Sequence, residues 1–366
     1  MKILFVLFSF AVPMIVLSWL LPKRYVLLSQ ILMTAAFICY ESPTSCAILA
    51  FISVGNYYLL HKSIFPKGVK IAISLIFLIV LVSSAKILFS ISHNWLIPLG
   101  ISYYTFRNIH YTLEYYKEKI RDDGILYYLA YNFFLPVILI GPINRYPDFI
   151  KDWHRRRFNK DYFSQGLQFI LYGLSKVIIL GNYFFTFKST QLISGISSKH
   201  VWLKTYLEML RFTFNAYFQF AGYSDIAVGL ALLMGYKIIE NFNYPFLATN
   251  MRDFWTRYHI SLSGFCKDYI YTPIASYYRK PLFGVIATML IIGLWHEVSL
   301  RYLLWGVMQA SGIYLATVIK SSSKSMVIKN LSRFYVINFF ALSCVIISHD
   351  KLIAALDIYK KLFLIS

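Results

Sequence analysis

Long apolar runs, many of them close to the length of a membrane-crossing helix, recur along the whole chain. The first covers 3–21. Further runs lie at 26–40, 45–60, 70–92, 125–143, 165–186, 203–235, 281–295, 300–319, 333–349 and 352–366. Because a simple crossing needs about 20 apolar residues, we expect the shorter runs to be tilted, re-entrant or interfacial. The pattern predicts a polytopic all-α membrane protein with roughly 9–12 hydrophobic helices.

The first apolar run has two readings, a secretory signal or a retained membrane span. It covers about 19 residues, and no small-x-small cleavage site precedes Lys23-Arg24. A signal peptide has a shorter apolar region followed by such a site. We therefore expect a retained first span, and a single integral membrane domain over 1–366.

Two stretches of the chain are more polar. Residues 144–163 combine a dense basic cluster with aromatic residues. They predict either a solvated cytoplasmic loop or an interfacial amphipathic helix with Trp153 and Phe158 in the headgroups. Residues 236–280 hold most of the candidate chemistry. The serine-rich patch at Ser321–Ser325 is expected to be a loop.

The composition excludes several classes of protein. Hydrophobic residues make up 58% of the chain and charged residues 14%, whereas a soluble protein carries about 25% charged residues. This is too little charge for a soluble enzyme with an anchor, a secreted disulfide scaffold or a disordered protein. The cysteines show no CxxC spacing, so we expect neither a disulfide framework nor a metal site.

The net charge is strongly positive, because 36 Lys and Arg stand against 16 Asp and Glu and give +20. Many of the basic residues flank the apolar runs, as Lys23-Arg24 does. Cytoplasmic loops are enriched in Lys and Arg, which also face anionic lipid. We therefore expect membrane lipid, and no nucleic acid, as the partner of these charges, with 144–163 and 252–280 facing the cytoplasm.

Histidines close to apolar runs are candidates for function, because ionisable groups at membrane depth are costly. Four lie beside charges at segment ends and are expected to be solvated: His61, His154, His200 and His349. His93 and His110 flank an aromatic-rich segment and have no assigned role. His296 differs, because it follows the apolar run 286–295 and precedes another apolar segment.

A set of ordered motifs gives these positions a context. Residues 241–263 read NFNYPFLATNMRDFWTRYHISLS, and Lys267-Asp268-Tyr269 follows. The other elements are Pro98–Phe106 (PLGISYYTF), Gly141–Tyr146 (GPINRY), Phe220–Asp225 (FAGYSD), Gly293–His296 (GLWH) and Leu304–Gly306 (LWG). Taken together and in chain order, these motifs over about 95–310 resemble those of the membrane-bound O-acyltransferase (MBOAT) family. The resemblance is to its bacterial branch of alginate O-acetylases and teichoic-acid D-alanyl transferases.

The resemblance implies a fold and an activity. The fold would be a ring of helices around a central pit in the bacterial cytoplasmic membrane. The activity would be transfer of an acyl group, acetyl in the first instance, to a hydroxyl of an extracytoplasmic polysaccharide or cell-wall polymer. The donor would be acyl-CoA or a phosphopantetheinyl carrier thioester, with no bound cofactor, and an exported partner acyltransferase would complete the transfer.

The resemblance also implies roles for two histidines. His296 would be the base that takes the alcohol proton as the hydroxyl attacks the thioester, a task that suits a neutral imidazole. We expect burial to keep His296 neutral. His259 would orient the acyl donor or a polar substrate group, or else be a structural histidine that tethers its segment.

Further residues of these motifs are weaker candidates for donor binding. Arg252, Arg257 and Lys267 could meet donor phosphates, although positive charge on the cytoplasmic face explains them equally well. Asp268 belongs to the same set. Asn241 and Asn243 are expected in a polar turn, Trp295 as a packing residue beside the site, and Asp225 as an architectural carboxylate with a basic or backbone partner.

This sequence departs from the branch at two positions. Glu297 stands where Gly often follows the motif histidine, and Gln309-Ala310 stands where His-Gly is frequent. The chain length is nearer to that of the D-alanyl transferases, so we expect a reduced C-terminal bundle, and D-alanyl transfer is the first alternative function. A proton-coupled transporter or flippase would show inverted repeats. A non-catalytic scaffold would tolerate replacement of His296.

Overall fold

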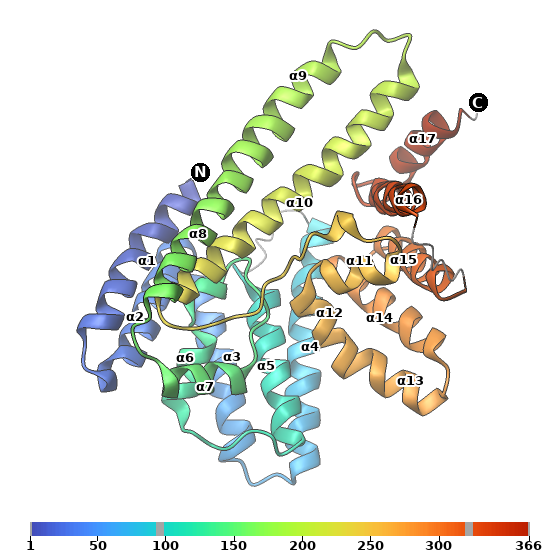
Figure 1. Ribbon diagram of the computed structural model, residues 1–366. Coiled ribbons are helices and arrows are strands. Elements are labelled where there is room, and N and C mark those ends of the chain that lie inside the picture. Colours follow the sequence, from blue (N-terminus) through green and yellow to red (C-terminus); the bar gives the residue numbers. More distant parts are fainter. Residues whose placement is uncertain (1, 93–98, 319–324, 365–366) are drawn as a thin grey trace. The chain divides into compact units, whose positions relative to one another are not determined.

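The computed structural model describes residues 2–92, 99–318 and 325–364. Pro98, His93 and most of the serine-rich patch lie outside these ranges. The described residues form helices joined by turns, with one isolated antiparallel bridge between Phe242 and Tyr258 (Figure 1). The predicted all-α class is confirmed.

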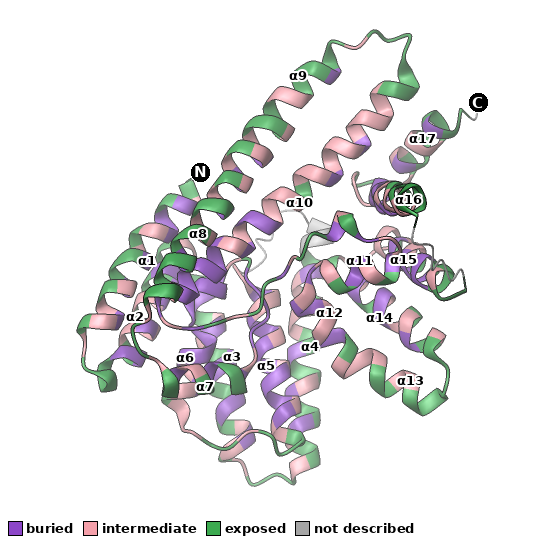
Figure 2. Ribbon diagram, viewed as in Figure 1, coloured by how far each residue is buried: buried purple, intermediate pink, exposed green. Residues whose placement is uncertain are grey.

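Several helical segments are long and apolar enough to cross a membrane. By length and composition these are Lys2–Leu20, Pro43–His61, Lys67–Leu88, Lys160–Ser194 and Val201–Leu233. Many large apolar side chains of these segments are exposed. Figure 2 shows that much of α8 (Lys160–Leu174) and α9 (Ser189–Ser194) is exposed. In water such a surface would be a costly apolar patch, whereas hydrocarbon accommodates it. The chain is a multi-pass membrane protein.

The chain divides into two compact units. The first comprises residues 1–172 and 223–239, and the second comprises 173–222 and 240–366. The first unit contains α1 (Lys2–Leu20), α2 (Lys23–Glu41), α3 (Pro43–His61), α4 (Lys67–Ser92), α5 (Ile101–Tyr116), α6 (Ile125–Asn132), η1 (Leu135–Val137), α7 (Tyr146–Arg155), most of α8 (Lys160–Leu174) and the end of α10 (Val201–Leu233).

The expected apolar run at 125–143 is not one helix. Helix α6 ends at Asn132, and a short 3-10 turn and further turns follow. Pro136 cannot donate a backbone hydrogen bond and disfavours a continuing helix. Gly141 permits the tight fold-back, because a Cβ there would lie 2.4 Å from the Cα of Val137. The segment is buried, so its apolarity reflects core packing of the unit.

Of the two expectations for the polar stretch 144–163, the amphipathic helix is present in its first half, but the placement of Trp153 in the headgroups is wrong. Its first half is the amphipathic helix α7, whose Trp153 is buried with the Lys23 ammonium 5.3 Å from the ring centroid. Arg156 donates to the carbonyls of Ser18 and Met234, both at 2.6 Å. The apolar face of α7 thus packs within the unit, and Trp153 does not reach the headgroups. Phe158 is exposed.

A buried polar cluster inside the first unit explains one further difference. The His61 side chain is only 5% exposed, and its Nε2 lies 2.9 Å from the Tyr111 hydroxyl. Its Nδ1 lies 3.6 Å from Asp122, a residue distant in sequence. The prediction that His61 is solvated is wrong, because these partners replace water. His154, His200 and His349 are exposed as predicted.

The second unit contains the motif residues from 241 onward. Its elements are the π-helical stretch η2 (Ser175–Lys188), α9 (Ser189–Ser194), the first part of α10, η3 (Pro245–Leu247), α11 (Met251–Arg257), α12 (Ile260–Cys266), η4 (Lys267–Tyr271), α13 (Thr272–Tyr278), α14 (Pro281–His296), α15 (Leu300–Val318), α16 (Met326–Val345) and α17 (Leu352–Phe363). Helices α11 to α13 are each seven residues long, far shorter than a membrane span.

Candidate active site

A small bridge of extended backbone holds the segment that carries His259. The backbone N–H of Asn243 donates to the carbonyl of Arg257 at 3.0 Å, and that of Ile260 donates to Asn241 at 2.9 Å. The Asn241 side-chain oxygen accepts from both the backbone N–H and the hydroxyl of Ser261, at 3.2 and 2.6 Å. The expected polar turn is therefore a clamp, and its buried member is Asn241.

His259 itself has a left-handed backbone. Its φ of 48° and ψ of 53° interrupt the path from α11 to α12. A left-handed non-glycine residue costs about 1–3 kcal/mol and persists only where the surroundings impose it. Here the clamp on either side imposes it. The strained backbone thus lowers local stability but fixes the orientation of the His259 imidazole.

The ring of His259 is buried without a polar partner. The residue is 3% exposed, and neither ring nitrogen bonds to another described residue. The ring packs edge-on against Phe220 at 4.7 Å and lies 6.1 Å from Trp295. Burial, and to a smaller extent the nearby His296, lowers the pKa of His259 to about 3. The imidazole is neutral at physiological pH. A buried polar group without a bond points to a ligand, a water or a catalytic role.

His296 is also close to Trp295. It is the last residue of α14, and its ring centroid is 4.4 Å from that of Trp295. Tyr302 stacks on it at 5.7 Å and Trp305 lies edge-on at 5.9 Å. The expectation that His296 is buried is wrong, because these rings cover only part of it and the residue is exposed. A substrate hydroxyl can therefore approach its imidazole.

Two motif glycines bring α14 and α15 into close contact. A Cβ on Gly293 would lie 2.3 Å from the carbonyl oxygen of Tyr302, and one on Gly306 would lie 2.7 Å from that of Met289. Small residues at helix crossings let backbones approach. The glycines of GLWH and LWG are thus a reciprocal pair that places Trp305 and Tyr302 against His296.

The carboxylate of Glu297, next to His296 in the sequence, forms an ion pair with Arg301. Glu297 accepts two hydrogen bonds from the guanidinium of Arg301, at 2.8 and 3.1 Å. Arg301 also donates to the backbone carbonyl of His349. Bidentate pairing of this kind fixes both partners. Glu297 therefore anchors the turn after α14.

The second departure from the family pattern ties three helices together. Gln309 is fully buried on α15, and its oxygen accepts from the indole N–H of Trp255 at 3.2 Å. Its amide nitrogen donates to the Ser343 hydroxyl on α16 at 2.5 Å. Trp255 belongs to α11, which leads to His259. The Trp255 side chain is therefore held by a specific hydrogen bond as well as by packing.

The candidate donor-binding residues are less closely organised. Arg252 and Lys267 are exposed, at the start of α11 and of η4, whereas Arg257 pairs with Asp253 at 2.8 Å. Asp268 is half-buried in η4, which packs on α14. The Asn243 side chain is exposed. Each of these residues belongs to the second unit, and Asp225 belongs to the first.

Sequence reasoning did not single out some residues of the site. Phe220 begins the FAGYSD motif, but its packing on His259 depends on a contact between segments distant in sequence. Tyr302 belongs to none of the motifs, although its position six residues after His296, across a turn, indicates that the two rings can meet. Among the described residues, no group of three or more His, Cys, Asp or Glu could hold a metal ion.

Comparisons with known proteins identify the family of this chain. The model of MBOAT, the membrane-bound O-acyltransferase family, matches residues 68–356. The "Probable alginate O-acetylase AlgI" of Pseudomonas fluorescens is 30% identical over 325 residues, which are 85% of this chain and 64% of that protein. The teichoic acid D-alanyltransferase of Bacillus subtilis is 31% identical over 236 residues, 60% of this chain and 58% of its own.

A third relative widens the range of polymers. The peptidoglycan O-acetyltransferase of Helicobacter pylori is 26% identical over 299 residues, 72% of this chain and 56% of its own. The chain thus spans less than two thirds of the length of these curated relatives. The family match itself covers most of the chain, including both histidines. The chain belongs to the membrane-bound O-acyltransferase family.

Proposed function

We propose that this chain transfers an acyl group, acetyl in the first instance, from a cytosolic thioester toward a hydroxyl of an extracytoplasmic polysaccharide or cell-wall polymer. The support is family membership together with the names of its relatives, which describe acyl transfer to alginate, peptidoglycan or teichoic acid. D-alanyl transfer is the second candidate, favoured by the match to the Bacillus subtilis enzyme.

The observation that carries the proposal is the proximity of both His259 and His296 to Trp295. His296 is exposed at the end of α14. In the proposed step its ring nitrogen takes the hydroxyl proton while the oxygen bonds to the thioester carbonyl carbon. The carbon–sulfur bond then breaks, and the proton passes from the imidazolium to the leaving thiolate. A positioned base contributes roughly 10²–10⁴-fold to such a reaction.

His259 has the complementary role in this proposal. Its neutral ring is fixed by the clamp and bonds to no other described residue. We assign its N–H to the carbonyl oxygen of the bound thioester, where negative charge develops. A fixed donor in a site that excludes water is worth roughly 10²–10³-fold in rate.

The donor and the setting complete the proposal. Arg252 and Lys267 are exposed cations that suit the phosphates of coenzyme A or of a phosphopantetheinyl carrier. The basic segment at 144–163 supports a position of that end of the first unit at the cytoplasmic face of a bacterial membrane. In one version of the pathway a separate exported acyltransferase accepts the group and finishes the transfer.

The test compares His296→Ala and His296→Gln with wild type and with His200→Ala, a matched change at an exposed histidine. The full chain in lipid nanodiscs is offered labelled acetyl-CoA, and separately acetyl- and D-alanyl-charged carrier, together with candidate acceptors. Free thiol and labelled product are both followed. Loss of at least about 10²-fold in the His296 variants alone supports the base assignment.

Three results would count against the proposal. Unchanged transfer by His296→Ala would remove the base assignment, whereas no transfer by wild type from any donor offered would favour the scaffold alternative. Transfer from the D-alanyl carrier alone would replace acetyl by the second candidate.

A further inference from the structure

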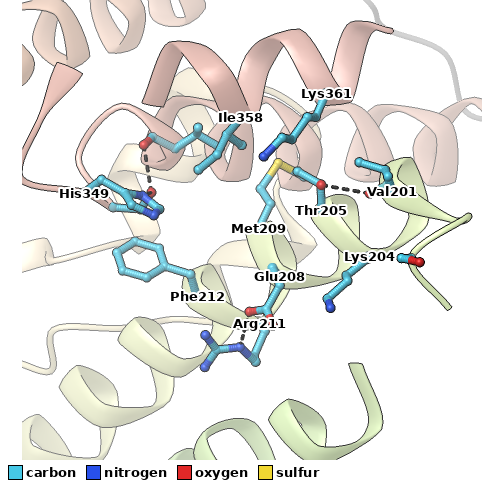
Figure 3. A pocket seen from close by; sticks show the side chains of 13 residues that line it. Val201, Lys204, Thr205, Glu208, Met209, Arg211, Phe212, His349, Ile358 and Lys361 are labelled. Carbon is cyan, nitrogen blue, oxygen red and sulfur yellow. Dashed lines mark hydrogen bonds and ion pairs between the residues drawn. The ribbon is translucent and has the colours of Figure 1, made fainter. Parts of the chain in front are cut away.

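A hollow in the second unit has a chemistry that the proposed reaction does not use. It measures about 600 Å³ and is bordered by the first half of α10, the end of α16 and α17. Figure 3 shows Lys204 from α10 and Lys361 from α17 among the residues that line it. Met209, Phe212 and Ile358 contribute an apolar part of the lining. The hollow is thus cationic at its rim and apolar inside.

The charges of the hollow are only partly balanced. Arg211 pairs with Glu208 at 2.6 Å, so this pair adds no net charge. Neither Lys204 nor Lys361 makes an ion pair with a described residue. The Thr205 hydroxyl beside them donates to its own helix, which leaves its lone pairs as acceptors. Two uncompensated ammonium groups therefore face the same space and favour an anion.

The surroundings place the hollow at a membrane surface. Trp202, half exposed at the start of α10, donates to the carbonyl of Leu362 on α17 at 3.0 Å. Helix α17 buries Ala355 and Leu362 but leaves Ile353 and Phe363 72% and 59% exposed. Tryptophans concentrate at the membrane interface. A helix with an outward apolar face and terminal lysines lies in the interface plane.

We propose that this hollow binds an anionic phospholipid. Its phosphate lies between Lys204 and Lys361, and the upper part of an acyl chain covers Met209, Phe212 and Ile358. A soluble phosphate would leave this wall in water, and a zwitterionic headgroup would leave the lysine charges in excess. An anionic glycan would meet the cations but would present hydroxyls to an apolar wall.

The test uses native mass spectrometry of the full chain released from mixed micelles. The micelles contain dioleoyl-phosphatidylglycerol or dioleoyl-phosphatidylcholine at equal mole fraction. Each surface lysine contributes about 1 kcal/mol of attraction to an anionic lipid. We therefore expect Lys204→Gln/Lys361→Gln to weaken phosphatidylglycerol retention about 25-fold. The control Lys280→Gln/Lys329→Gln carries the same change in net charge outside the hollow and should retain the lipid.

A second variant and two competitors keep the proposal open to failure. Ile358→Asn should weaken the retention of phosphatidylglycerol, although both lysines are still present. Glycerol phosphate at millimolar concentration should not displace the lipid. Equal retention of both lipids, or an equal effect of the two lysine pairs, would overturn the proposal. Displacement of the lipid by glycerol phosphate would reassign the hollow to a free phosphate. Tighter binding of an anionic oligosaccharide through the same lysines would reassign it to a polymer.

Discussion

Replacing His259 with leucine should stabilise this protein while it abolishes transfer. The imidazole is buried with a donor and an acceptor that bond to no other described residue. Burying an unsatisfied polar group costs about 1–3 kcal/mol in proteins. Leucine removes that cost and keeps apolar contact with Phe220, but it adopts the left-handed region less readily than histidine. We therefore expect a net gain toward the lower end of about 1–3 kcal/mol.

The gain can be read as a melting temperature. Unfolding entropy of about 2.1 cal/mol/K per residue gives a rise of about 1–4 °C for a chain of this size. Intrinsic tryptophan fluorescence of the full chain in detergent reports it, at one fixed scan rate because unfolding of such proteins is often irreversible. The labelled-acyl assay should show at least about a 10²-fold loss of product for the same variant.

A matched variant separates the backbone from the ring. His259→Asn keeps a side chain that adopts the left-handed region readily and still carries a donor and an acceptor. It should melt close to wild type but transfer poorly. A fall of more than about 3 °C in His259→Leu would refute the reasoning, because it would mean that the imidazole makes stabilising bonds and has a structural role.

Further predictions concern pH, the buried amide and the helix crossing. Because the pKa of His259 is about 3 when folded and about 6.5 when unfolded, the unfolded chain binds the extra proton between these values. The free energy of unfolding therefore decreases as the pH is lowered through that window. Between pH 7 and pH 5, wild type should lose about 2 kcal/mol relative to His259→Leu. Gln309→Leu leaves the buried Trp255 N–H without an acceptor, whereas the Ser343 hydroxyl loses one bond and still donates to Phe340. The substitution should cost about 1–3 kcal/mol, seen as a lower melting temperature. Gly306→Ala places a Cβ 2.7 Å from the Met289 carbonyl, and should cost about 1–3 kcal/mol and reduce transfer by moving His296.

Each of these predictions has a result that contradicts it. An identical pH profile for wild type and His259→Leu would show that the imidazole is not buried in the neutral form. An unchanged melting temperature in Gln309→Leu would mean that the two hydrogen bonds of Gln309 are not formed. For the glycine, Gly312→Ala is an unsuitable control, since its Cβ also meets a side chain at 2.5 Å. Gly55→Ala meets nothing within 4 Å and should be harmless.

Local motifs predicted much of the site, because its residues are close in sequence. Asn241, His259 and the residues between them form one clamp, and the glycines at 293 and 306 act through a single helix crossing. The long apolar helices were equally readable, because a membrane imposes their length. These features depend on short-range geometry or on the solvent, both of which the sequence expresses directly.

The errors arose where partners come from distant parts of the chain. His61 is buried because Asp122 and Tyr111 replace its water, and neither is near it in sequence. Trp153 is buried under Lys23. His296 is exposed because Tyr302 and Trp305 cover only one part of its ring, which no local pattern states. Burial of a polar side chain is a property of the tertiary structure. The flanking residues alone therefore cannot show whether such a side chain is buried or exposed.

Gln309 has a consequence for how this protein tolerates acid. A neutral imidazole, such as relatives of this branch often carry here, offers one acceptor and one donor, as the amide of Gln309 does toward Trp255 and Ser343. Protonation of an imidazole turns its acceptor into a second donor and breaks the match with an indole N–H. An amide does not titrate. The link from α11 to α16 in this chain therefore persists at a pH that would sever its histidine counterpart.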